Sequence, residues 1–410
     1  MLLREPLSVL TGGPGCGKST TLRVLLDRLD ERAPEVDAKG NELARYLLAA
    51  PTGKAARRMQ EATGRDASTI HRLLEYGPGF GGLGFQRHAK NPIEASLVVV
   101  DEASMVDVRL AEALLDAIDP ETTRLAFVGD ANQLPSVGPG RVLSDFVESE
   151  SIPVARLTTL HRAAAESWVC RAAPRMLAGE TPDLEAAPDF HFFEVEEAAE
   201  AARVTLELAT SGAYGPVPPQ VLTPQRPHVI GVTALNRAIQ AKVNPARPGE
   251  ATARRGEGRD AFELRMRDRV LQTRNDYQRG VFNGEVGNVV AIGPKAVTVD
   301  FDGRAIDFDA MAVRGLDLAY ALTIHKSQGS EWPWVIVVCH SAHTFMLSRQ
   351  LVYTAVTRAK KGVLLVGDKK GLASALKNVA PSQRFTTLAE RLRAPESTEA
   401  PAPASAGGVA

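Results

Sequence analysis

The sequence predicts an α/β protein with two parallel-sheet domains, a small inserted all-β barrel and a short inserted hairpin. Three observations lead to this fold class. Short apolar runs alternate with helical patterns over residues 1–150 and again from residue 318. The segment LTGGPGCGKSTT, Leu10–Thr21, joins the first apolar run to a helical pattern. Inside the second α/β region, Arg265–Asp309 changes to short alternating strands with Asn-Gly and Asp-Gly turns.

Length and charge limit the classes of function. A chain of 410 residues is too long for one ordinary core, so two or three domains are expected. A formal net charge of −1 gives no global basic signal. Contact with nucleic acid must therefore come from local basic patches, which weighs against a purely electrostatic DNA binder.

The cysteines and apolar runs indicate a cytoplasmic protein. Cys16, Cys170 and Cys339 lie far apart and form no C-x-x-C pair, which is typical of reduced thiols and argues against a structural zinc site. The N-terminal MLLREPLSVL carries charges and a proline and lacks the pattern of a secretory signal. The best apolar run, Trp334–Cys339, is too short to span a membrane and predicts a buried strand.

The first α/β region is predicted to contain four buried parallel strands, each ending at polar or glycine residues where such a sheet places its ligands. They are Leu7–Leu10, Tyr46–Ala50, Leu97–Val100 and Leu125–Val128. The insertion Tyr76–Asn91 is rich in glycine, aromatic and basic residues, so it is either a plain loop or a protruding hairpin.

The second α/β region surrounds the β-rich insertion. A strand at Val221–Thr223 and a helix at Val232–Val243 precede the insertion. After the insertion, buried strands resume at Leu318–Ile324 and Val335–Cys339. The segments Leu351–Arg358 and Val363–Val366 complete this region. The low-complexity stretch that ends the chain predicts disorder.

Gly12–Ser19 matches the phosphate-binding pattern G-x-x-x-x-G-K-[ST]. Glycines there let backbone N–H groups converge on phosphate oxygens, Lys18 reaches the β- and γ-phosphates, and Ser19 ligates Mg²⁺. The predicted nucleotide-binding residues of this loop are Gly12, Gly13, Pro14, Gly15, Cys16, Gly17, Lys18, Ser19 and Thr20.

Two further strand ends supply candidate catalytic groups. In LVVVDEASM, Asp101 would hold Mg²⁺ through water and Glu102 would act as general base, although an acidic pair can also cap a helix. Gln133, in AFVGDANQLPSVGPG, would sense the γ-phosphate or serve as a turn residue. Arg162 and Arg358 are candidate arginine fingers, although any single arginine is more often a surface residue.

Polar residues at other strand ends are candidates for gripping a polymer. In APTGKAARRM, Thr52, Lys54 and the arginines at 57 and 58 could hold phosphates, or could form an ordinary basic helix. ASTIHRLL adds His71. The segment ALTIHKSQGSEW gathers donors that include Thr323 and His325 between buried strands, which favours ligand contact.

Together these segments resemble a known family. GGPGCGKST, APTGKAARRM, VVVDEASM, VGDANQLPSVGPG, LHR, LTIHKSQGSEW and VYTAVTRA occur in the order of the superfamily 1 helicase motifs. The sequences of these motifs are similar to those of the RecD-like DNA helicases, especially the stand-alone branch that acts outside the RecBCD complex. The resemblance covers Leu7–Asp368.

The resemblance implies two RecA-like motor domains, with ATP and Mg²⁺ in the cleft between them and single-stranded DNA running across both. It also implies 5′→3′ movement, a strand-separating pin at Tyr76–Asn91, and a barrel at Arg265–Asp309 that clamps the DNA. The implied first motor domain is 1–160, with the pin at 76–91. The implied second motor domain consists of 161–264 and 313–392, and the barrel at 265–312 is inserted between these two parts. Residues 393–410 are an implied disordered tail.

Carried over to this sequence, the resemblance assigns two groups of site residues. The ATPase site consists of Lys18, Ser19, Asp101, Glu102, Gln133, Arg162 and Arg358, with Glu331 also binding nucleotide. The DNA-facing motifs contain Thr52, His71, Thr323 and His325.

The sequence departs from the family pattern in three places. Cys16 replaces a usual threonine, which would make the ATPase sensitive to thiol reagents, and Asn132 replaces a frequent aspartate. Met1–Pro6 is too short for the helix that carries the family's adenine-reading glutamine.

We therefore expect an ATP-dependent 5′→3′ DNA helicase or translocase of DNA repair or recombination. It would bind single-stranded DNA and single–double-strand junctions, act as a monomer, and not bind membranes. A P-loop ATPase or kinase without a polymer substrate would lack the second motor domain. A GTPase would need an Asn-Lys-x-Asp segment, which is absent. A non-enzymatic DNA scaffold would not need the nucleotide motifs.

Overall fold

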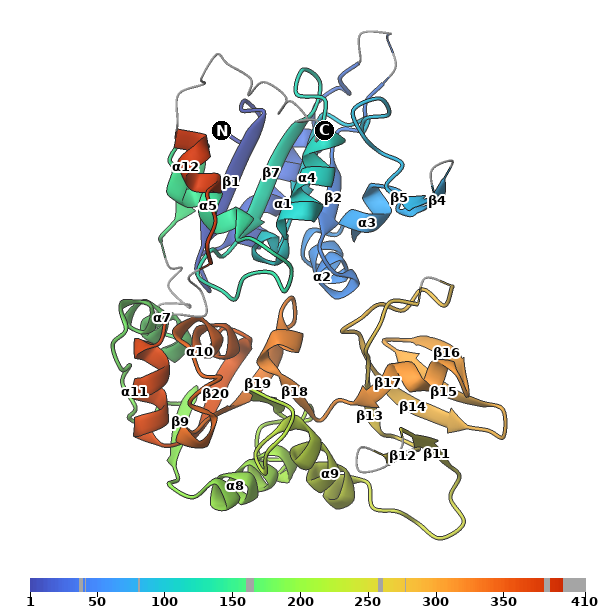
Figure 1. Cartoon of the computed structure of the whole chain (residues 1–410), viewed down its shortest axis with the longest axis vertical. Coiled ribbons are helices and arrows are strands. Elements are labelled where there is room, and N and C mark those ends of the chain that lie inside the picture. Colours follow the sequence, from blue (N-terminus) through green and yellow to red (C-terminus); the bar gives the residue numbers. More distant parts are fainter. Residues whose placement is uncertain are drawn as a thin grey trace, which may run out of the picture.

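The computed structural model describes residues 1–36, 40, 42–79, 82–159, 166–256, 261–276, 278–379 and 384–393. These residues form two α/β lobes that follow one another along the long axis of the molecule, and a β-rich module beside the second lobe (Figure 1). We call residues 1–159 the first lobe, residues 166–243 with 319–379 the second lobe, and residues 252–318 the β-module. The predicted tail lies outside the described residues except for Arg393.

The centre of the first lobe is a six-stranded parallel sheet with the order β3-β2-β6-β7-β1-β8. All four residues of β6 are buried, as expected for a parallel sheet covered on both faces. The four predicted strands are present as β1, β2, β6 and β7. The strands are β1 (Leu7–Gly12), β2 (Leu47–Ala50), β3 (Ala67–Thr69), β6 (Leu97–Val100), β7 (Arg124–Gly129) and β8 (Val154–Leu157), and the helices are α1 (Lys18–Asp30), α2 (Gly53–Thr63), α3 (Ile70–Leu73), η1 (Ala103–Met105), α4 (Val108–Asp116) and α5 (Val142–Ser149).

The insertion Tyr76–Asn91 contains two short strands, β4 (Gly77–Gly79) and β5 (Gly82–Gly84). They pair antiparallel, with Gly77 opposite Gly84. Residues 80 and 81, between these strands, lie outside the described part of the chain.

The second lobe has a five-stranded parallel sheet with the order β18-β10-β19-β20-β9. The predicted helix is present as α9, with the same bounds. The strands are β9 (Phe190–Glu194), β10 (Gln220–Thr223), β18 (Ala321–Thr323), β19 (Trp332–Cys339) and β20 (Ala359–Gly367), and the helices are α7 (Trp168–Ala178), α8 (Ala198–Thr210), α9 (Val232–Val243), η4 (Ile324–Ser327), η5 (Ser341–His343), α10 (Arg349–Val356) and α11 (Lys369–Lys377).

The apolar run Trp334–Cys339 lies within β19, and five of its residues, from Val335 to Cys339, are buried. Among the described residues, no helix combines the length and apolar character needed to cross a membrane.

The β-module is an antiparallel sheet with the order β16-β15-β14-β13-β17. Asp302 and Gly303 form the turn between β15 and β16, with φ values of 51° and 87°, as expected for an Asp-Gly hairpin. The described residues show no pairing between β16 and β17, so the sheet is open and the predicted closed barrel is not confirmed. The strands are β11 (Thr252–Arg255) and β12 (Phe262–Arg265), which form a separate ribbon, and β13 (Arg269–Gln272), β14 (Val286–Ile292), β15 (Ala296–Phe301), β16 (Arg304–Asp309) and β17 (Leu316–Leu318), with η3 (Ala312–Gly315) before β17.

The prediction of one strand over Leu318–Ile324 is wrong. The chain changes sheets there, because β17 pairs with β13 of the β-module whereas β18 pairs with β10 of the second lobe. The buried amide of Gln220 donates hydrogen bonds to the carbonyl oxygens of Ala319 (3.3 Å) and Tyr320 (3.0 Å) at this crossing. The Tyr320 carbonyl also accepts from the backbone N of Val221 in β10 at 3.4 Å, so side-chain and backbone donors together satisfy the chain at this crossing.

Asp268 connects the β-module to α9. Its carboxylate is fully buried. It accepts hydrogen bonds from Gln240 Nε2 (2.6 Å) and Asn244 Nδ2 (2.7 Å), at the end of α9. Tyr320 Oη (2.9 Å) and the backbone N of Arg265 (2.8 Å) donate as well.

Replacing Asp268 by alanine is expected to destabilise the protein by about 3–5 kcal/mol, because four donors, two of them on the buried side chains of Gln240 and Asn244, lose their acceptor. The measurement is the urea midpoint followed by tryptophan fluorescence. Asp116→Ala is the matched control, since Asp116 is an exposed residue at the end of α4 and its loss should change stability by less than about 0.5 kcal/mol. Equal midpoints for the two variants would contradict this role of Asp268.

The last described segment, residues 384–393, which we call the C-terminal strap, returns to the first lobe. It contains α12 (Leu388–Arg393), which packs beside α5 (Figure 1). Leu388 and Leu392 pack against the apolar core of the first lobe. The hydroxyl of Thr386 donates to Asp145 Oδ2 of α5 at 2.8 Å.

Candidate active site

The loop between β1 and α1 has the backbone of a phosphate-binding loop. Gly15 and Gly17 have φ values of 72° and 80°, which other residues adopt only under strain. Lys18 Nζ donates to the carbonyl oxygens of Gly12 (2.6 Å) and Gly13 (3.0 Å), so its ammonium group lies along the loop. Because no side chain caps the start of α1, the backbone N–H groups of its first turn point into the loop, where an anion can accept from them.

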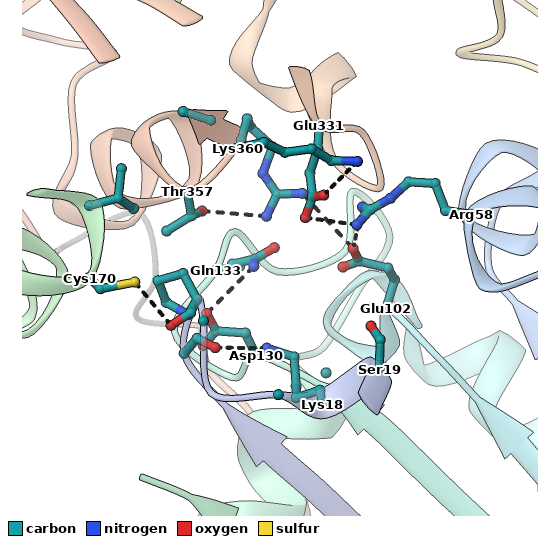
Figure 2. A pocket seen from close by; sticks show the side chains of 18 of the residues that line it. Lys18, Ser19, Arg58, Glu102, Asp130, Gln133, Cys170, Glu331, Thr357 and Lys360 are labelled. Carbon is teal, nitrogen blue, oxygen red and sulfur yellow. Dashed lines mark hydrogen bonds and ion pairs between the residues drawn. The ribbon is translucent and has the colours of Figure 1, made fainter. Parts of the chain in front are cut away.

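This loop lines a cavity of about 560 Å³ that both lobes form (Figure 2). That size is in the range of small-molecule sites. The first lobe contributes Gly13, Pro14, Gly15, Gly17, Lys18, Ser19, Thr20, Arg58, Asp101, Glu102, Gly129, Asp130 and Gln133, and the second contributes Ser167, Val169, Cys170, Glu331, Thr357, Arg358, Ala359 and Lys360.

Two adjacent carboxylates follow β6. Asp101 Oδ1 accepts from the backbone N of Glu102 at 2.8 Å. Burial, and secondly the negative charge of Glu102, raises the pKa of Asp101 to about 6. Glu102 has a φ of 51°, an uncommon backbone for a non-glycine residue that is often found at functional sites. The oxygens of Asp101 and Ser19 line the same cavity and are of the type that Mg²⁺ prefers, so the donor set fits this ion.

Arg58 of α2 lies between carboxylates of the two lobes (Figure 2). Its Nη2 is 2.7 Å from Glu331 Oε1, and its Nη1 is 3.5 Å from Glu102 Oε1. Lys360 Nζ lies 3.6 Å from the other oxygen of Glu331. Arg58 was predicted among residues that could grip a polymer, whereas its guanidinium lies in the cavity.

Arg358 reaches the cavity from the second lobe and is only 2% exposed. Its Nε donates to the carbonyl oxygen of Thr354 (3.1 Å), and its Nη2 donates to Thr357 Oγ1 (3.4 Å). Its Nη1 lies 3.9 Å from Glu102 Oε1 of the first lobe. These contacts fix an arginine opposite the phosphate-binding loop.

Hydrogen bonds join the two lobes next to Gln133. Gln133 Nε2 donates to Asp130 Oδ2 at 3.5 Å. The same oxygen accepts from the hydroxyl of Tyr353, in the second lobe, at 2.7 Å. Burial, and then the charge of Asp130, raises the pKa of Tyr353 well above its usual value of 10, so the hydroxyl remains a donor.

The structure brings most of the predicted nucleotide residues together. Gly12 and Cys16 do not line the cavity, and Arg162 lies outside the described residues. Asp130 was missed, although its place at the end of β7 matches that of Asp101 at the end of β6. The sequence gives no signal for Cys170, whose thiol donates to the carbonyl of Pro14 at 3.7 Å. The other lining residues that were not predicted are Arg58, Gly129, Ser167, Val169, Thr357, Ala359 and Lys360.

The predicted DNA-facing threonines cap helices at strand ends. Thr52 Oγ1 accepts from Ala55 N (3.2 Å) at the start of α2, and Thr323 Oγ1 accepts from Lys326 N (3.4 Å) at the start of η4. A Cβ atom on Gly329 of the second lobe would lie 3.5 Å from Thr52 Oγ1, so the two lobes are in contact at this point. His325 is exposed.

Lys54 and His71 have different surroundings. Lys54 Nζ lies 4.8 Å from the centre of the Trp332 ring. Burial, and then the charges of Arg269 and Arg58, lowers the pKa of Lys54 to about 7. His71 packs against the rings of Tyr76 and Phe85 in the insertion, with ring centres 5.6 and 5.7 Å apart.

The β-module contacts the first lobe beside Lys54. Arg57 Nη1 lies 3.0 Å from Asp302 Oδ2, and a Cβ on Gly53 would be 2.5 Å from the Phe282 ring. A groove of about 310 Å³ there is lined by Arg57, Arg72 and Phe282, among others. Basic and aromatic side chains in one groove are typical of single-stranded nucleic acid sites.

Comparison with protein families assigns three parts of the chain. Residues 1–139 match an AAA domain, residues 235–301 the SH3 domain of ATP-dependent RecD-like DNA helicases, and residues 318–366 a UvrD-like helicase C-terminal domain. The RecBCD enzyme subunit RecD of Mycolicibacterium smegmatis is 36% identical over 430 residues, which cover 95% of this chain and 73% of that protein.

The chain belongs to the RecD-like family of DNA helicases. Within this family it is also 42% identical to the ATP-dependent RecD2 DNA helicase of Deinococcus radiodurans, over 391 residues and 95% of this chain. The chain spans 50% of the length of that relative.

Two solved structures are similar in fold to this chain. Pif1 of Bacteroides bound to single-stranded DNA has a TM-score of 0.53 at 21% identity, covering 89% of each chain. Pif1 of Candida albicans has a TM-score of 0.52 at 18% identity, covering 90% of this chain and 93% of that chain. These similarities show a shared fold.

Proposed function

We propose that this RecD-like chain is an ATP-dependent 5′→3′ DNA helicase or translocase that acts in DNA repair or recombination. The observation that carries the proposal is Arg358 of the second lobe, which faces the phosphate-binding loop of the first lobe across one cavity. An ATP molecule held there would contact both lobes, so its hydrolysis changes the forces between them. The names of the RecD2 and RecD relatives support the same activity.

The residues of the cavity have complementary roles in this proposal. Lys18 and the loop N–H groups bind phosphate oxygens, and Glu102 accepts the proton of the attacking water. Arg358 and Arg162 stabilise the charge that develops on the γ-phosphate. Ser19 and Asp101 would hold Mg²⁺, which neutralises phosphate charge when bound.

On the DNA side, we propose that Thr52, Lys54, His71, Thr323 and His325 contact single-stranded DNA across both lobes. The groove beside Phe282 supports a clamp by the β-module, and the pairing of β4 with β5 supports a strand-separating pin. The domain boundaries remain those given above, 1–160, 161–264, 265–312 and 313–392, and the protein is proposed to act as a monomer on single–double-strand junctions.

The test of this function is ATP hydrolysis with and without single-stranded DNA. Turnover should rise many-fold when DNA is added, and equal turnover would contradict the motor. A duplex with a 5′ overhang should be unwound, whereas one with a 3′ overhang should not. The opposite preference would exclude 5′→3′ movement.

The lowered pKa of Lys54 predicts that DNA affinity depends on pH. Lys54 is protonated below about pH 7 and neutral above it, so a phosphate contact is strongest at the acid side. Between pH 6 and pH 8 at constant salt, the dissociation constant for single-stranded DNA should rise by up to about tenfold. Fluorescence anisotropy with a labelled oligonucleotide measures this change.

Two variants separate Lys54 from other titrating groups. Lys54→Arg stays protonated and should flatten the pH profile, whereas Lys54→Gln should bind weakly at both pH values. A wild-type profile that persists in both variants would assign the pH dependence to another residue.

A further inference from the structure

The C-terminal strap holds the loop 130–141, which joins β7 to α5 and carries Gln133. Arg384 Nη1 donates to the carbonyl oxygens of Gly138 and Gly140, both at 2.6 Å. Arg384 Nη2 donates to the carbonyl oxygen of Ser136, also at 2.6 Å. One planar guanidinium therefore satisfies three carbonyls of the same loop, which a shorter or monodentate donor cannot do.

The opposite side of the loop is packed tightly against the start of α4. A Cβ on Gly138 would lie 2.0 Å from Asp107 Oδ2, and one on Gly140 would lie 2.2 Å from Val108 Cγ2. The backbone N of Val108 also donates to the carbonyl oxygen of Pro139 at 3.0 Å. With its glycines pressed against α4, the loop presents the carbonyls of 136, 138 and 140 to Arg384.

The other end of the loop is attached to the second lobe. The backbone N of Leu134 donates to Thr354 Oγ1 at 2.9 Å, and the carbonyl oxygen of Leu134 accepts from Gln328 Nε2 at 2.8 Å. Gln133 is the neighbour of Leu134 and lines the nucleotide cavity. Its position therefore depends on the second lobe at Leu134, and on α4 together with the C-terminal strap at residues 136–140.

We propose that Arg384 is a positioning residue for ATP hydrolysis, because it fixes one end of the loop 130–141. When Arg384 holds residues 136–140, a displacement of the second lobe at Leu134 moves Gln133 relative to the cavity. When residues 136–140 are released, the loop absorbs the displacement and Gln133 does not follow the second lobe. This inference rests on the proposed ATPase function.

The test compares Arg384→Gln with Arg393→Gln in the full chain. Arg393 lies in the same strap and donates to the carbonyl oxygen of Ser149 (3.3 Å) at the end of α5, away from the loop 130–141. Arg384→Gln should lower the kcat of DNA-stimulated ATP hydrolysis about tenfold, with the KM for ATP changed less than about twofold. Arg393→Gln should keep the wild-type kcat, and Arg384→Lys should recover part of the loss.

Hydrogen–deuterium exchange provides a readout that does not need turnover. The backbone amides of Leu134, Ser136, Val137, Gly138 and Gly140 should exchange faster in Arg384→Gln than in the wild type or in Arg393→Gln. Equal kcat losses in the two glutamine variants, or unchanged exchange in the loop, would overturn the positioning role and leave a purely structural strap. A wild-type protein without DNA-stimulated ATPase activity would instead overturn the proposed function itself.

Discussion

Replacing Lys18 by alanine is expected to lower ATP turnover by at least about 100-fold, because the ammonium group that binds the phosphates is lost from the loop. In the structure its Nζ lies within 3.0 Å of two loop carbonyls, so it is held where the phosphates would bind. Steady-state release of phosphate in the presence of single-stranded DNA measures the effect. The affinity for single-stranded DNA without nucleotide should stay within about threefold of wild type.

The matched control is Lys369→Ala. Lys369 lies in the second lobe, is 64% exposed and pairs with Glu194, far from the phosphate-binding loop in the fold. Its loss should leave turnover and DNA affinity unchanged. If Lys18→Ala lost DNA affinity as strongly as turnover, the variant would be misfolded or the loop would not be a nucleotide site.

The sequence was most informative where function depends on short contiguous segments. The segment Gly12–Ser19 and the pair Asp101–Glu102 could be predicted as neighbours from local pattern, because each follows a buried strand and the carboxyl ends of parallel strands share one edge. The same argument, applied to β7, would have found Asp130. The bounds of α9 were predicted correctly for a similar reason, since a helix with an apolar face depends mainly on local pattern.

Residues whose role depends on contacts between the lobes could not be predicted in this way. Arg58 lies in the same basic run as Arg57, yet Arg58 pairs with Glu331 in the cavity while Arg57 pairs with Asp302 of the β-module. Successive residues on a helix point about 100° apart, so two adjacent arginines meet different partners. Which partner each one meets is determined by how the lobes pack, and no local pattern records it.

The packing of the lobes also places the carboxylate of Glu102 beside two arginines in the cavity. Glu102 has Arg58 at 3.5 Å and Arg358 at 3.9 Å, so the proposed base and the proposed arginine finger are partners of each other in the structure. A triphosphate placed in the cavity would compete with Glu102 for both guanidinium groups. Because one of them belongs to the second lobe, binding and hydrolysis of ATP would change a contact between the lobes as well as the chemistry.

Replacing Arg358 by lysine is therefore expected to lower kcat by about 100-fold or more, with a much smaller change in the KM for ATP. Lysine keeps the positive charge but cannot hold the carbonyl of Thr354 and reach toward Glu102 with one planar group. Single-turnover hydrolysis of ATP in the presence of single-stranded DNA separates this loss from a slower release of product.

Lys360→Gln is the control for this substitution, because Lys360 lines the same cavity and is 60% exposed. Its partner Glu331 keeps the closer contact with Arg58, so turnover should change by no more than about threefold. Equal losses in the two variants would mean that hydrolysis is sensitive to any change among the basic side chains of the cavity, and would contradict a specific role of the Arg358 guanidinium. A loss confined to Arg358→Lys would mean that hydrolysis needs a guanidinium supplied by the second lobe, which is the requirement for coupling ATP turnover to movement between the lobes.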